Sequence, residues 1–264
     1  MSIEIINGRR VGITRSGEGA PMLMLHCALA HRGVLAPLMA KMPAHAFTAF
    51  DMPGHGESEF DAAVDIQGQA VETAICLLEA NGPSDVFGHS FGATVALKLA
   101  LERPDLVRKV CLYEPVYFAV LAGANPEAYA AETRASAAFT KATLAKDWPA
   151  AARAFLARWS IEGFDNIPSA QKTYILKTIP LIMASNASII LPESGAEVLK
   201  ALAMLSAPVL LMKGAKSPKV IAQIATVLAD HGPAVTLVTL PKAAHMGPIT
   251  HAGGVAQVVA SFLD

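Results

Sequence analysis

The sequence predicts an α/β fold: a mostly parallel central sheet of about eight strands, covered by helices on both faces and carrying a helical lid insertion. Short, continuously apolar segments of strand length alternate with helical patterns along most of the chain. Hydrophobic residues make up 53% of the 264 residues and charged residues only 16%, so the chain can bury a large core. A long Ala-rich interval near the middle breaks the alternation and indicates an insertion.

The predicted elements follow one another in a regular order. Residues 3–6 and 11–17 form an opening hairpin closed by Asn7-Gly8, a pair that favours a tight turn. Further strands are predicted over 21–26, 47–51, 85–89, 107–114, 208–214 and 235–240. Helices are predicted near 31–41, 65–80, 91–103, 218–230 and 252–263. In such a sheet, ligands bind beyond the carboxyl ends of the strands.

The interval between the sixth and seventh strands has no convincing strand pattern, and its segments such as "EAYAAETRASAAFTKATLAK" read as helices. We therefore predict a core formed by residues 1–114 and 207–264, and a helical lid over the carboxyl edge of the sheet formed by residues 115–206.

Composition and charge limit the classes of partner. The formal net charge of −1 provides no attraction for nucleic acid or an anionic membrane, and no apolar run is long enough to span a bilayer. Zinc-ligand spacings and Walker-type phosphate loops are absent, so we expect no metal and no cofactor. Three scattered cysteines and an N-terminus without an apolar signal segment favour the cytoplasm. A small-molecule substrate is expected; a homo-oligomer is compatible with the sequence, which leaves the oligomeric state open.

The stretch "DVFGHSFGATVALKLA" (85–100) predicts a nucleophile. An apolar strand runs into an Ala/Leu-rich helix, and Ser90 stands at the apex between Gly88 and Gly92. A strand that turns directly into a helix leaves room only for small residues around an apex with positive φ. The hydroxyl of Ser90 would then be exposed above the sheet edge at the positive end of a helix.

A serine hydroxyl needs a base to remove its proton and an acid to orient that base. His245 follows the last strand by a short loop at the carboxyl edge, where Ser90 must lie, and we predict it as the base. The loop after the 208–214 strand offers Ser217 in place of a carboxylate. From residue 198 onward the only carboxylates are Asp230 and Asp264, neither on the correct side of the sheet, so Glu114 at the end of the sixth strand is predicted as the acid.

Acyl transfer also needs N–H donors directed at the developing oxyanion. One is expected from Phe91, the residue after the nucleophile, and the other from "HCALAHRG" after the third strand, most simply Ala28 with Cys27 as the alternative. We interpret Cys27 as a small buried side chain that serves only in packing. The other interpretation is a reactive thiol beside the nucleophile.

With these motifs the chain resembles the α/β-hydrolase superfamily. "GHSFG" is similar to its nucleophile elbow, "LHCALA" to its oxyanion loop, "FDMPGHGES" (50–58) to its D-x-P-G-x-G-x-S segment and "AAHMGP" to its histidine loop. Cys27 replaces the glycine usual after the oxyanion-loop histidine, and Ser217 stands where most members keep their acid. An acid at the position of Glu114 is what some haloalkane dehalogenases use, but those have an aspartate nucleophile, so the resemblance implies no dehalogenation here.

These residues predict a cofactor-free serine hydrolase that cleaves an ester, thioester or lactone of a small, largely apolar molecule through an acyl-enzyme on Ser90. Hydrolysis of a carbon–carbon bond and perhydrolysis stay open, because the same triad serves all three reactions. A non-catalytic ligand receptor with the same fold is the alternative from another class.

Overall fold

Eight strands form one central sheet in the computed structural model, which describes residues 2–264. They are β1 (Ser2–Ile6), β2 (Arg9–Ser16), β3 (Ala20–Leu25), β4 (His45–Phe50), β5 (Ser84–His89), β6 (Val107–Tyr113), β7 (Val209–Gly214) and β8 (Val235–Leu240). Their order across the sheet is β1-β2-β4-β3-β5-β6-β7-β8. β1 and β2 pair antiparallel, as the Asn7-Gly8 turn predicts, and β2 pairs antiparallel with β4; every pairing from β4 to β8 is parallel. The predicted fold class is confirmed.

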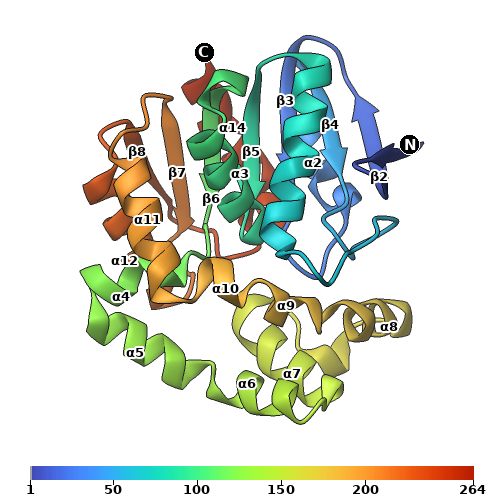
Figure 1. Ribbon diagram of the computed structural model, residues 1–264, viewed down its shortest axis with the longest axis vertical. Helices are drawn as coiled ribbons and strands as arrows, with labels where there is room; N and C mark the ends of the chain where they lie inside the picture. The colour runs from blue at the N-terminus through green and yellow to red at the C-terminus, as the bar shows by residue number, and fades with distance from the viewer. Residues whose placement is uncertain (1) are drawn as a thin grey trace.

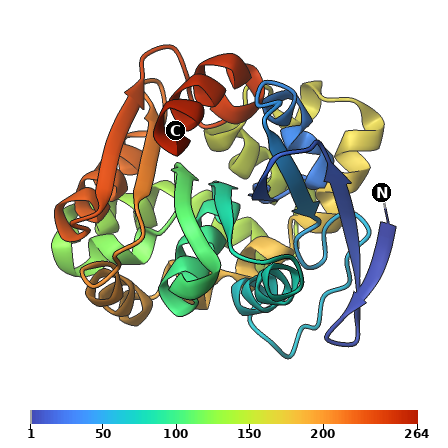
Figure 2. The same ribbon diagram turned by 90° about the horizontal axis from the view of Figure 1, so that it is seen from above.

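Helices cover both faces of this sheet. The core helices are α1 (Ala36–Met39), α2 (Ile66–Asn81), α3 (Phe91–Glu102), α12 (Lys219–His231), α13 (Gly247–Thr250) and α14 (Ala252–Leu263), with 3₁₀ turns η1 (Arg32–Leu35) and η2 (Pro104–Leu106). Side chains of α2, α3 and α12 share one hydrophobic cluster with the sheet, and those of α1 and α14 share a second. In Figure 2 the red C-terminal helix accordingly lies on the opposite side of the sheet from the cyan and green helices α2 and α3.

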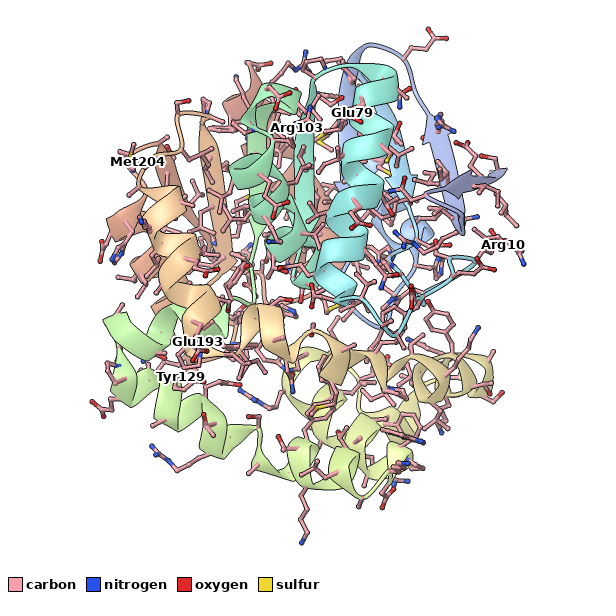
Figure 3. All side chains as sticks on the ribbon, in the orientation of Figure 1. Arg10, Glu79, Arg103, Tyr129, Glu193 and Met204 are labelled. Carbon is pink, nitrogen blue, oxygen red and sulfur yellow. The ribbon has the colours of Figure 1, made fainter. Side chains whose placement is uncertain are left out.

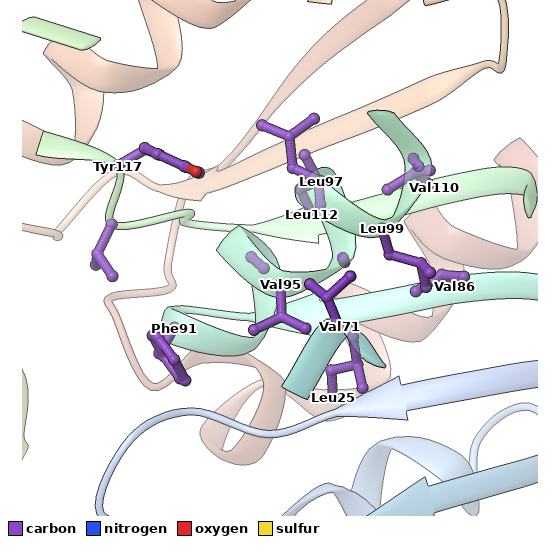
Figure 4. Close-up of a cluster of buried hydrophobic side chains, with 14 of the residues drawn as sticks. Leu25, Val71, Val86, Phe91, Val95, Leu97, Leu99, Val110, Leu112 and Tyr117 are labelled. Atoms are coloured by element: carbon purple, nitrogen blue, oxygen red, sulfur yellow. The ribbon is translucent and has the colours of Figure 1, made fainter. Parts of the chain in front are cut away.

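The first cluster forms the main core. Figure 4 shows Val86 of β5 together with Val110 and Leu112 of β6, against Val95 and Leu99 of α3. All five side chains are buried. Burial of side chains of this size contributes about 1.5–3 kcal/mol each to the free energy of folding. The elbow therefore stands between two elements that are firmly packed on each other.

The predicted strand boundaries agree with the structure to within two residues, and two local differences have clear causes. β6 ends at Tyr113 because Glu114 adopts a positive φ of 50°, which an extended strand does not accommodate. The helix predicted near 31–41 is divided into η1 and the four-residue α1, with Pro37 in the first turn of α1.

The insertion, residues 115–206, is helical throughout its regular elements. It contains α4 (Leu121–Ala124), α5 (Pro126–Ala135), α6 (Ala137–Leu144), α7 (Trp148–Trp159), α8 (Ser169–Thr178), α9 (Leu181–Ala184), α10 (Asn186–Ile189), α11 (Pro192–Leu202) and the 3₁₀ turns η3 (Phe118–Val120) and η4 (Phe164–Asn166). In Figure 1, α5 to α9 lie beyond the carboxyl ends of β5, β6 and β7. The two ends of the insertion pack into the main core, through Tyr117 and Val120 on one side and Val198 and Leu202 on the other.

Candidate active site

Ser90 occupies a sharp turn between β5 and α3. Its backbone has φ 57° and ψ −117°, a strained conformation for a residue with a side chain. A Cβ on Gly88 would lie 2.3 Å from the Gly92 carbonyl oxygen, and one on Gly92 would lie 2.3 Å from the carbonyl oxygen of Leu25. Both glycines are therefore required by the close approach of neighbouring backbone, which is the steric reason given by the sequence pattern.

Three predicted side chains meet at the carboxyl edge of the sheet. Nε2 of His245 lies 2.9 Å from Oγ of Ser90, and Nδ1 of His245 lies 2.7 Å from Oε2 of Glu114. All three residues are buried. Because an ionised carboxylate only accepts hydrogen bonds, Nδ1 carries the proton of the neutral ring and Nε2 is left to accept from the serine hydroxyl. This is the arrangement that a general base requires, and the catalytic roles of the three residues stay predictions.

Glu114 makes more contacts than the sequence indicated. Its Oε1 accepts hydrogen bonds from the Gly214 amide at 2.6 Å and from the Ser217 hydroxyl at 2.5 Å, while its own amide donates to the Met212 carbonyl at 2.9 Å. Ser217, the residue found where an acid was first sought, therefore contacts the carboxylate and not the imidazole. Each carboxylate oxygen therefore accepts at least one hydrogen bond, and the position of Oε1 is fixed by the Gly214 amide, a backbone donor that cannot rotate.

Two further side chains, which sequence reasoning did not single out, hold the backbone of the histidine loop. Nε2–H of His89 donates to the carbonyl of His245 at 2.7 Å, and the Tyr113 hydroxyl donates to the carbonyl of Ala244 at 2.8 Å. Burial, and next the neighbouring His245, lower the pKa of His89 to about 3, so this ring is neutral. Its Nδ1 is buried without a hydrogen-bond partner among the described residues.

The predicted oxyanion donors are Ala28 and Phe91. Within residues 2–264, neither amide donates to a protein acceptor, and both residues line the cavity described below together with Ser90. Cys27 is buried, and burial raises the pKa of its thiol to about 12, which agrees with the interpretation as a packing side chain and not as a reactive thiolate. That Ala28 and Phe91 stabilise an oxyanion is part of the proposal below.

Two buried histidines fix the loop that carries Ala28. His26 accepts from the Met52 amide through Nε2 at 2.9 Å and donates from Nδ1 to the Cys27 carbonyl at 2.7 Å. His55 accepts from the Leu29 amide at 3.2 Å and donates from Nδ1 to the carbonyl of Pro53. Burial lowers the pKa of His26 well below its usual value and that of His55 to about 4. Both rings therefore serve as neutral donor–acceptor bridges.

These pKa shifts predict that the protein loses stability in mild acid. His26, His55 and His89 are neutral when folded but bind protons near pH 6.5 when unfolded, so the unfolded state gains more protons as the pH falls. The free energy of unfolding should decrease from pH 6.5 down to about pH 4, by up to about 1.4 kcal/mol per pH unit for each histidine. Urea unfolding at pH 7.0, 6.0 and 5.0 measures this slope.

A matched variant separates this contribution from that of the carboxylates. In His55→Gln the slope should be smaller than in the wild type, since one buried site that cannot be protonated when folded has been removed. A wild-type stability at pH 5.0 equal to that at pH 7.0 would contradict the prediction.

Ser90 and His245 line a cavity of about 510 Å³ between the sheet and the insertion. Most of its lining is apolar, with Val116, Phe155, Ile175 and Leu181 among the contributors from the insertion. The ring centroid of Trp159 on α7 lies 4.8 Å from that of His245, so the insertion contacts the imidazole directly. The cavity can therefore hold a small apolar group against Ser90.

Polar side chains of the insertion occupy part of the same cavity. Both terminal nitrogens of Arg158 bind the carboxylate of Glu132, at 2.8 and 2.7 Å, and the Arg158 guanidinium lies 5.0 Å from the Trp159 ring centroid. Tyr129, labelled in Figure 3 below α11, donates to the Ile190 carbonyl at 3.0 Å. The charges of Arg158 and Glu132 offset each other, so this pair adds no net charge to the cavity.

Residues 2–264 contain no group of three or more His, Cys, Asp or Glu side chains placed to hold a metal ion. None of the helices over the same residues is both long and apolar enough to cross a membrane.

The chain is similar in sequence and in fold to several known hydrolases. Over 262 aligned residues the chain is 28% identical to a pimeloyl-[acyl-carrier protein] methyl ester esterase of Neisseria meningitidis, covering 91% of this chain and 92% of the relative. A 2-hydroxymuconate semialdehyde hydrolase of a Pseudomonas species is 33% identical over 117 residues, 41% of each chain. An alpha/beta hydrolase of Sphaerobacter thermophilus superposes over all of both chains with a TM-score of 0.73 at 22% identity. Since the model of the alpha/beta hydrolase family matches residues 22–258, the chain belongs to that family and is a hydrolase.

Proposed function

We propose that this hydrolase cleaves an ester, thioester or lactone of a small, largely apolar molecule through an acyl-enzyme on Ser90. The observation that carries the proposal is the continuous hydrogen-bonded series from Glu114 through His245 to the Ser90 hydroxyl, which ends in the cavity. No metal or cofactor takes part in the proposed reaction.

The proposed reaction has two stages. Oγ of Ser90 attacks the substrate carbonyl carbon while its proton passes to Nε2 of His245, and the resulting oxyanion accepts hydrogen bonds from the amides of Ala28 and Phe91. The histidine then gives this proton to the leaving group as the carbon–oxygen or carbon–sulfur bond breaks. Water, deprotonated by His245, attacks the acyl carbon, and the carboxylic acid leaves as Ser90 regains its proton. Glu114 orients the ring and stabilises its cation throughout.

The apolar lining favours an acyl or alcohol group without charge. The similarity to a methyl ester esterase supports the choice of an ester, and the similarity to a 2-hydroxymuconate semialdehyde hydrolase keeps carbon–carbon bond hydrolysis as the second candidate. Both reactions would use the same three side chains, so only substrates distinguish them.

A series of p-nitrophenyl esters of increasing chain length tests the proposal. We expect kcat/KM to rise by up to about fourfold per methylene, the value of burying one CH₂, until the chain fills the cavity of about 510 Å³, and to fall afterwards. Lactones and aryl diketones should be assayed beside the esters. Cleavage of diketones without turnover of any ester would replace the proposal with carbon–carbon bond hydrolysis.

A fluorophosphonate probe distinguishes an enzyme from a receptor. The wild-type protein should incorporate one equivalent, and peptide mapping should place the adduct on Ser90. Ser84→Ala, at the other end of β5, is the matched control and should label normally. A protein that neither labels nor hydrolyses any substrate of the series would be a receptor, not an enzyme of this kind.

A further inference from the structure

Tyr174 connects the insertion to two loops of the core at once. It lies on α8, and its hydroxyl donates to the carbonyl of Ala30 at 2.6 Å while accepting from the amide of Gly56 at 2.9 Å. The hydroxyl thus acts both as donor and as acceptor, and both partners are backbone groups more than 100 residues away in sequence. Such a double contact fixes the two loops relative to each other and to α8.

Ala30 belongs to the oxyanion loop, which we define as residues 26–31, and lies two residues after the proposed oxyanion donor Ala28. The residue between them, Leu29, has a positive φ of 58°, which costs a non-glycine residue about 1–2 kcal/mol. A conformation of this kind persists only where its surroundings hold it. The Leu29 amide is held by His55, and the Ala30 carbonyl is held by Tyr174.

The Leu29 side chain provides a second link to the insertion. It packs against two small hydrophobic clusters that are built from insertion residues, and Phe155 of α7 packs against both of them. Consecutive residues of the oxyanion loop, one through its side chain and one through its carbonyl, are therefore in contact with the insertion. Ala28 precedes both residues and lines the cavity, and its amide has no protein acceptor among the described residues.

We propose that Tyr174 is a positioning residue for the oxyanion site, so that the helical insertion sets the place of the Ala28 amide. The inference rests on the proposed function, in which that amide binds the oxyanion. An oxyanion donor must lie within about 2.7–3.1 Å of the developing charge, so a shift of the loop by a fraction of an ångström weakens the bond. Among the described residues, the Tyr174 hydroxyl bonds to the Ala30 and Gly56 backbone and not to Ser90 or His245, although Tyr174 lines the same cavity.

This role predicts an effect on the transition state and not on substrate binding. The oxyanion exists only once Ser90 has attacked, so a displaced Ala28 amide lowers kcat while KM stays nearly constant. Removal of an oxyanion donor costs about 10²–10³-fold in kcat, and a displaced donor should cost less. A purely structural role for Tyr174 would instead lower the fraction of folded protein and leave kcat per active site unchanged.

The test compares Tyr174→Phe with Tyr117→Phe, both assayed on the best p-nitrophenyl ester with active sites counted by fluorophosphonate titration. Tyr117 is a matched control, because its hydroxyl also reaches from the insertion to the core, to Gln67 of α2 at 3.5 Å, but makes no hydrogen bond to the oxyanion loop among the described residues. We expect kcat to fall about 10- to 100-fold in Tyr174→Phe with KM within about threefold, and both constants to stay near wild type in Tyr117→Phe.

A trifluoromethyl ketone of the same chain length supplies a readout that unfolding would not move. Ser90 adds to the carbonyl carbon of the ketone, and the proton of the serine hydroxyl passes to His245. The ketone has no leaving group, so the resulting oxyanion is stable and occupies the proposed oxyanion site. Its inhibition constant should weaken in Tyr174→Phe by the same factor as kcat/KM falls. Equal loss of kcat in both variants, or an unchanged inhibition constant in Tyr174→Phe, would overturn the role of Tyr174. Ester hydrolysis by the wild type would still support the proposed function. A wild type that neither labels nor hydrolyses esters would overturn both.

Discussion

Replacing Ser90 by alanine should lower kcat on any hydrolysed ester by about 10⁴-fold or more, equivalent to about 5 kcal/mol of transition-state stabilisation. The reason is that the acyl-enzyme cannot form, because no other hydroxyl accepts a hydrogen bond from or donates one to Nε2 of His245 within the described residues. The residual rate would come from the oxyanion donors and substrate binding alone. Steady-state assays and fluorophosphonate labelling measure the two consequences separately.

The fold should survive this substitution. Alanine has the same Cβ as serine, so the strained φ of 57° costs it no more, and the backbone bond from the amide of residue 90 to the Tyr113 carbonyl is kept. The thermal midpoint should therefore stay within a few degrees of the wild type, and Ser84→Ala should retain full activity. Near-normal turnover by Ser90→Ala without a covalent adduct would show that Ser90 is not the nucleophile.

The features that could be predicted from the sequence are those with a local steric or chemical cause. The elbow is one, because the need for Gly88 and Gly92 arises from backbone within a few residues or on the neighbouring strand. The alternation of apolar strands and helices is another, since its period is contained within each segment. Because few carboxylates follow residue 198, Glu114 could be identified as the candidate acid by elimination. The structure does bring its carboxylate to His245.

The contacts that could not be predicted are those made by tertiary packing. His89 stood inside the recognised motif, yet only the approach of β5 to the histidine loop reveals that it donates to the His245 carbonyl. Trp159 ends the Ala-rich helix α7 and Tyr174 lies on α8, and neither helical pattern indicates which core residues the side chain will contact. Ser217 appeared as a replaced acid, whereas its hydroxyl binds the carboxylate that orients the base.

Replacing Glu114 by glutamine should lower kcat by about 10²–10⁴-fold, through the tautomer of His245. Three groups now donate to the carboxylate: the Gly214 amide and Ser217 hydroxyl to Oε1, and Nδ1–H of His245 to Oε2. A glutamine has one oxygen for these two places. Its NH₂ group cannot face the Gly214 amide, a donor that is fixed in the backbone, so its oxygen must take that place.

The glutamine NH₂ would then face Nδ1 of His245, and two donors cannot share a hydrogen bond. The ring would have to carry its proton on Nε2 instead, toward Ser90, where it could no longer accept the serine proton. Ser217→Ala removes a donor but leaves the Gly214 amide, the carboxylate charge and the tautomer, so its kcat should fall less than about tenfold. Assays of both variants on one ester decide the ranking. If Ser217→Ala abolished activity while Glu114→Gln kept it, a hydroxyl or water would support the histidine, and Glu114 would only end a strand.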